Sequence, residues 1–72
     1  MYISEMYRVY IANKKTKKTH LYAYAEEYDE VDQIKSEIKE KINNKKLCLP
    51  NGNKANVILV QNEHGRVETI EM

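Results

Sequence analysis

The stretch Asn56–Val57–Ile58–Leu59–Val60 predicts a strand that is apolar on both faces, because successive side chains of a strand point to opposite sides. A sheet built around such a strand needs cover on both faces. The chain offers one amphipathic helix, predicted over Asp29–Asn43, and one helix shields one face. The other face therefore has to meet water, a second copy or a partner, which indicates a binding surface.

The remaining strands follow from period-two alternation and from turn residues on either side of them. The predicted strands cover Met6–Ala12, His20–Ala25, Lys46–Leu49, Val57–Val60 and Arg66–Ile70. Asn-Gly within Pro50–Asn53 predicts a tight turn. We therefore expect an α+β fold, with a single antiparallel sheet of four to five strands in the order β-β-α-β-β-β and one helix packed on one face. Residues 1–72 are expected to form a single small domain.

The predicted helix has a plausible start and a narrow apolar stripe. Asp29 is the expected N-cap, since aspartate accepts hydrogen bonds from the first free backbone N–H groups. The apolar stripe recurs at steps of three and four residues and consists of Val31, Ile34, Ile38 and Ile42. This spacing predicts that the stripe faces the sheet.

Size and motif content argue against catalysis. A 72-residue chain is too short to enclose a ligand-sized pocket of roughly 300 Å³ and keep a core as well. His20 and His64 lie far apart in the sequence, with no cysteine or carboxylate at metal-ligand spacing. We therefore expect no enzyme activity, catalytic residue, cofactor, metal or small-molecule substrate.

Compartment and origin are indicated only by composition. The single cysteine, Cys48, cannot form an internal disulfide, which favours the reducing cytoplasm. No run of about eighteen apolar residues is present, so we expect no membrane contact. The abundance of lysine, asparagine and isoleucine is typical of an AT-rich genome, which favours a phage- or mobile-element-encoded protein.

Tyrosine supplies all the aromatic side chains, with six in the chain. If Val9, Ile11, Leu21 and Ala23 lie under the helix, alternation puts the opposite side chains on the open face. That set is Arg8, Tyr10, His20, Tyr22 and Tyr24. The opposite register of the second strand, which would bury its tyrosines, stays open. Tyrosine and arginine are enriched at interfaces, so we predict that this face binds another protein or a second copy, as a homodimer, in the role of an inhibitor or adaptor.

A cluster of lysines supports an alternative function. Lys14, Lys15, Lys17 and Lys18 lie within five residues in the connection between the first two strands. Such a basic hairpin tip could bind nucleic acid through phosphate contacts. The overall net charge of only +1 makes this the second hypothesis.

Acidic residues provide a third candidate surface. They crowd the start of the predicted helix and one of its faces, as Glu26, Glu27, Asp29, Glu30 and Glu37. Acidic side chains at a helix N-terminus are stabilised by the helix dipole, which explains them without a partner. The alternative is an acidic surface that docks on a basic protein.

Overall fold

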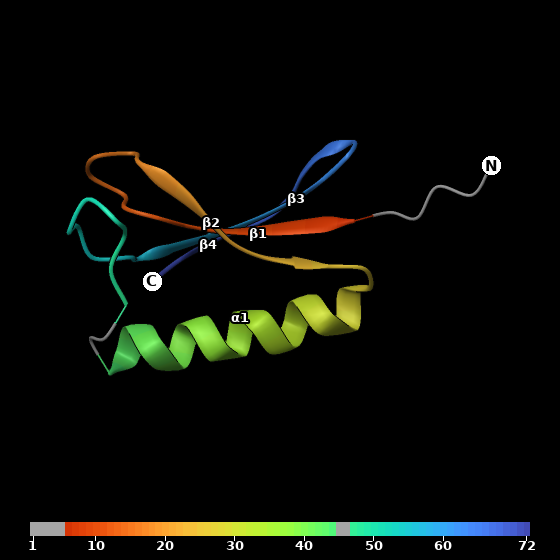
Figure 1. Ribbon diagram of the computed structural model, residues 1–72, viewed down its shortest axis with the longest axis horizontal. Coiled ribbons are helices and arrows are strands. Elements are labelled where there is room, and N and C mark those ends of the chain that lie inside the picture. Colours follow the sequence, from red (N-terminus) through yellow and green to blue (C-terminus); the bar gives the residue numbers. More distant parts are fainter. Residues whose placement is uncertain (1–5, 45–46) are drawn as a thin grey trace.

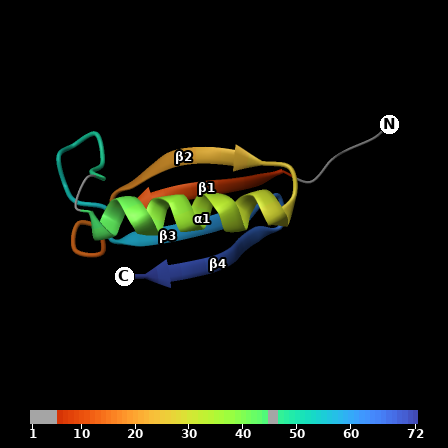
Figure 2. The same ribbon diagram turned by 90° about the horizontal axis from the view of Figure 1, so that it is seen from below.

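The computed structural model describes residues 6–44 and 47–72. Its elements are β1 (Tyr7–Ala12), β2 (Thr19–Ala25), α1 (Tyr28–Asn43), β3 (Val57–Asn62) and β4 (Gly65–Glu71). The four strands form one antiparallel sheet in the order β2-β1-β3-β4. The helix lies along one face of this sheet (Figures 1 and 2). The prediction of an α+β fold with a single antiparallel sheet is therefore confirmed.

The core lies between α1 and the two central strands. In the register of β1 with β3, Val9 is opposite Val60 and Ile11 is opposite Ile58. Residues that are directly opposite in an antiparallel pair share a face, so these side chains form one apolar layer. The fully buried side chains are Val9, Ile11, Val31, Ile38, Ile58 and Val60. Each such side chain contributes roughly 1.5–3 kcal/mol through burial, which makes this layer the main source of stability.

The predicted third strand at Lys46–Leu49 is wrong for the part that the structure describes, and the element order is β-β-α-β-β. Leu47–Leu49 forms only an isolated bridge, between Cys48 and Lys54, and Lys46 lies outside the described residues. The segment reverses direction at once, since Gly52 adopts a φ of 90° and its N–H donates to the Leu49 carbonyl at 2.9 Å. Leu49 itself is buried in the core. Its apolar character therefore reflects a loop that is anchored in the core.

The helix begins slightly earlier than predicted. Glu27, with an extended backbone, is the N-cap, and its side chain makes no capping hydrogen bond. Asp29 is therefore not the cap; it lies in the first turn, where its charge is favourable toward the helix dipole. The last residue of the helix, Asn43, is as predicted. Within the described residues, α1 is not long and apolar enough to span a membrane.

Candidate functional site

One face of the sheet is the face that α1 does not cover, and we call it the open face (Figure 1). Tyr10 lies on it, because its neighbours Val9 and Ile11 both belong to the core layer. Tyr10 is opposite Leu59 on β3 and Leu21 on β2, and all three side chains are half-buried. They form a row of apolar and aromatic side chains across three strands.

The exposed apolar area on β3 is smaller than its sequence suggests. Ile58 and Val60 are fully buried, and Val57 is only 7% exposed although it lies on the open face. Val57 is directly opposite Ala12 on β1 and Glu71 on β4, so it has a neighbouring strand on each side. Leu59 is thus the one side chain of Val57–Val60 that contributes appreciable surface to the open face.

A shallow hollow of about 290 Å³ occupies one end of the open face. Met6, Arg8, Tyr24 and Glu63 line it, which places predicted site residues from β1 and β2 together. Arg8 is directly opposite Tyr24, and its guanidinium donates a hydrogen bond to the Asn62 carbonyl at 3.2 Å. Tyr24 is 56% exposed and Met6 is 44% exposed. The hollow thus combines a fixed cation, an accessible ring, a flexible thioether and a carboxylate.

The second strand does not keep the register on which the site prediction depended. Its pairing with β1 shifts between Val9 and Tyr10, which leaves Tyr22 as an extra residue. The Tyr22 hydroxyl donates to Glu37 at 3.2 Å and accepts from Lys41 at 2.9 Å, both on α1. Tyr22 therefore lies on the helix side.

The same register shift moves His20 away from the predicted site. His20 is opposite Ile11, a core residue, so it too lies on the helix side, at the exposed edge. Of the five predicted site residues, Arg8, Tyr10 and Tyr24 share the open face. Tyr22 and His20 do not, because a bulge reverses the side-chain alternation within β2.

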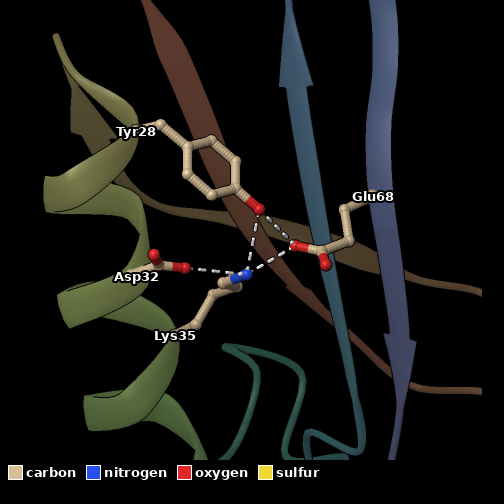
Figure 3. A network of polar contacts seen from close by, with 4 residues as sticks. All are labelled: Tyr28, Asp32, Lys35 and Glu68. Carbon is tan, nitrogen blue, oxygen red and sulfur yellow. Dashed lines mark hydrogen bonds and ion pairs between the residues drawn. The ribbon is translucent and has the colours of Figure 1, made fainter.

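A second polar network, which sequence reasoning missed, joins α1 to β4 on the other flank of the helix (Figure 3). The Lys35 ammonium lies 2.6 Å from Glu68 and 3.1 Å from Asp32, and it donates to the Tyr28 hydroxyl at 3.2 Å. The Tyr28 hydroxyl donates to the same Glu68 oxygen at 3.1 Å. Lys35 is only 9% exposed.

The charges of this network and of the Tyr22 contact stabilise one another. Hydrogen bonding to Glu68 raises the pKa of Lys35 well above its usual value, and the Lys35 ammonium in turn lowers the pKa of Glu68. The Tyr22 hydroxyl raises the pKa of Lys41. A tyrosine, a lysine and a carboxylate thus hold each flank of α1 to the sheet. These contacts anchor the helix to the sheet.

The four predicted lysines lie in the turn between β1 and β2, and all are exposed. Asparagines fix this turn against the loop before β3. The Asn13 amide donates to the Lys54 carbonyl at 2.8 Å, and the Asn56 side chain accepts from the Lys14 N–H at 2.8 Å. A fifth lysine, Lys54, is thereby brought to the lysine turn, although it is 36 residues from Lys18 in the sequence. Lys14 also makes an ion pair with Glu71 at 3.2 Å.

The acidic residues lie at the opposite end of the molecule from the lysine turn, where β2 leads into α1 (Figure 1). Glu26, Glu27, Asp29 and Glu30 are exposed there. Glu30 and Glu37 line a second shallow hollow of about 400 Å³ on α1, together with Gln33 and Ile34. Glu37 is already engaged by Tyr22 and Lys41, so it is the least available of the predicted acidic residues.

The described residues contain no group of three histidine, cysteine, aspartate or glutamate side chains that could hold a metal ion. His64 contacts only its neighbour Glu63, at 3.5 Å, among the ion pairs within this part of the chain. No protein-family model matches the chain, and no curated protein or solved structure matches it.

Proposed function

We propose that this protein acts by stoichiometric, non-enzymatic contact with another protein, through the open face of its sheet. The observation that carries the proposal is the gathering of Arg8, Tyr10 and Tyr24 on the face opposite α1, with Met6 and Leu59 beside them. Arginine, tyrosine and methionine are enriched in interfaces relative to other surfaces. Arg8 is also held in place before binding, which lowers the entropic cost of contact.

The shape of the surface supports the proposed role of an inhibitor or adaptor. The two hollows described above are shallow, and neither is lined by a nucleophile with an activating base. A small domain with one preorganised face suits occupancy of a larger target. The lysine- and asparagine-rich composition supports an origin in a phage or mobile element.

The test replaces the open-face tyrosines. The variant Tyr10→Ser/Tyr24→Ser should capture at least about ten-fold less of its target from the native host, because interface tyrosines commonly contribute more than 1 kcal/mol each. The matched control is Tyr22→Ser, which makes the same change on the helix side and should retain capture. Circular dichroism establishes that each variant is folded. Equal capture by the folded double variant and the wild type would exclude the open face.

A second candidate function is nucleic-acid binding through the lysine turn. The observation that favours it is the asparagine scaffold, which holds the turn in one conformation and brings Lys54 to it. Preorganised cations bind phosphates with a smaller ordering cost than a mobile loop would.

Salt dependence separates this candidate from the first. Binding to a labelled duplex or single strand should weaken steeply as salt rises. It should be lost in Lys14→Ala/Lys15→Ala/Lys17→Ala/Lys18→Ala and kept in Lys39→Ala, whose lysine lies on α1. Absence of any binding at low salt would remove this candidate.

A further inference from the structure

The strand β2 is an edge of the sheet. In the order β2-β1-β3-β4 it has a single neighbour, and no other described segment pairs with its outer side (Figure 2). An edge strand presents backbone N–H and C=O groups that can pair with a further strand. The covering helix contacts the face of β2 through Tyr22, which leaves the edge itself open.

Opposite charges flank β2. Lys17 and Lys18 precede it, and Glu26 and Glu27 follow it. All four side chains are exposed, and none makes an ion pair within the described residues. The two groups lie at opposite ends of the molecule, because β2 runs along its length (Figure 1).

The charges form a mirror pattern about Tyr22. Counting outward from Tyr22, Lys18 corresponds to Glu26 and Lys17 to Glu27. A strand with this pattern is complementary to itself when a second copy runs in the opposite direction.

On the other edge, β4, both carboxylates are engaged within the chain, and Arg66 is the one charged residue of this strand without an ion pair among the described residues. Its Glu68 is engaged by Lys35 at 2.6 Å and its Glu71 by Lys14 at 3.2 Å, both within the same chain. Self-pairing through β4 would have to compete with these contacts. The unpaired charges therefore distinguish β2 as the edge that is suited to a second copy.

We propose that two copies of this chain join through β2 as an antiparallel, two-fold symmetric pair, with the middle of β2 at the symmetry axis. Lys18 and Lys17 of one copy then lie beside Glu26 and Glu27 of the other, at both ends of the paired strands. Charge complementarity thus favours a second copy in the antiparallel orientation as the partner.

This interface is separate from the open face, so it goes beyond the proposed function. An axis normal to the sheet relates the two copies, because antiparallel strands in a continuous sheet are related in that way. The two open faces then lie side by side on one surface, and both helices lie on the other. The dimer would present two copies of the target-binding face.

The first test is solution mass, measured by sedimentation equilibrium over roughly 1 μM to 1 mM, a range that covers weak and moderate protein contacts. We expect a monomer–dimer equilibrium that shifts toward monomer as salt rises. Lys17→Glu/Lys18→Glu and Glu26→Lys/Glu27→Lys should each weaken dimerisation by roughly 10- to 100-fold, because four attractive pairs become repulsive. A mixture of the two variants should form a heterodimer.

The control for net charge is Lys39→Glu/Arg66→Glu, which reverses two exposed cations away from β2 and should leave dimerisation unchanged. A wild-type chain that stays monomeric throughout would overturn the proposal. So would charge variants that dimerise as the wild type does, or a mixture that stays monomeric.

A cross-linking measurement tests the antiparallel pairing even if a charge variant fails to fold. In a Cys48→Ser background, Tyr22→Cys should form an intermolecular disulfide on mild oxidation, because residues near the symmetry axis of an antiparallel pair approach closely enough. Tyr24→Cys, which lies farther from the middle of β2, should not. Cross-linking of Tyr24→Cys at an equal or faster rate would contradict the predicted pairing.

Discussion

Lys35 is the residue whose role was hardest to predict from the sequence. It lies between Val31 and Ile38 on the side of α1 that faces the sheet, where an apolar residue is the usual choice. The helical spacing could have placed Lys35 on that stripe. Its main partner, Glu68, is 33 residues away, and no local pattern predicts a contact across that separation.

Removal of the Lys35 side chain should destabilise the fold. Lys35→Ala leaves Glu68 and Tyr28 without their shared donor, and we expect a loss of about 1–3 kcal/mol in the free energy of unfolding. This expected loss in the free energy of unfolding is smaller than for a fully buried ion pair, because the Glu68 side chain is 35% exposed. Urea unfolding measures it, and Lys39→Ala on the exposed side of α1 serves as the control. A loss no larger than that of the control would contradict the anchoring role.

Glu68 gives this contact a pH dependence. The Lys35 ammonium lowers the pKa of Glu68 in the folded state below its ordinary value of 4.5. A carboxylate of this kind stabilises the fold above its unfolded pKa, and the contribution is lost as pH falls through the folded pKa. The difference in unfolding free energy between the wild type and Glu68→Gln should therefore be largest near neutral pH and should shrink below pH 4.5.

Urea unfolding of both proteins from about pH 7 to about pH 3 measures this difference. Glu40→Gln, an exposed substitution on α1, is the control. A difference that does not change with pH would show that the ion pair contributes nothing through the charge of Glu68.

At the scale of the elements, the sequence predicts the helix, four strands and the Asn51-Gly52 turn, because periodicity and turn residues act locally. The faces of β1 also follow from its alternation. The faces of β2 do not, since a single extra residue at Tyr22 reverses them. The extra residue, Tyr22, contacts Glu37 and Lys41 on α1, and no pattern in the local sequence predicts these contacts or the bulge, so the sequence could not place His20 and Tyr22 correctly.

The start of α1 offers a stabilising substitution. Glu27 has the extended backbone of an N-cap, with φ −123° and ψ 153°, yet its side chain does not cap. Glu27→Asp keeps the charge and supplies a shorter carboxylate that can accept from the first turn, so we expect a gain of about 0.5–1 kcal/mol. Thermal and urea unfolding measure the gain. Glu26→Asp makes the same change one residue earlier and should give none; equal effects would show that capping is not the cause.

At the scale of the whole molecule, the near-neutral net charge hides two charged ends. The chain returns to the lysine turn through the loop before β3, which adds Lys54, while the acidic residues stay at the start of α1. The lysine cluster and the acidic cluster can each be predicted from the local sequence. Only the topology shows that the two clusters lie at opposite ends of the molecule along β2. This arrangement makes a second, antiparallel copy complementary in charge.

The separation of the sheet into a covered face and an open face can be tested with two adjacent residues of β3. Ile58 is fully buried against the helix layer, and its neighbour Leu59 is half-buried on the open face. Ile58→Ala should cost about 2–5 kcal/mol, which is enough to unfold much of a domain this small. Ile58→Val should cost only about 0.5–1.5 kcal/mol, so its effect on the free energy of unfolding stays measurable by urea unfolding.

Leu59→Ala should cost clearly less than Ile58→Ala, because its side chain already meets solvent in the single chain. The measurement should be made at low protein concentration, where association does not cover the open face. An equal cost for the two substitutions at every concentration would mean that Leu59 is enclosed within one chain. The open face would then lack the apolar centre on which target binding is proposed to depend.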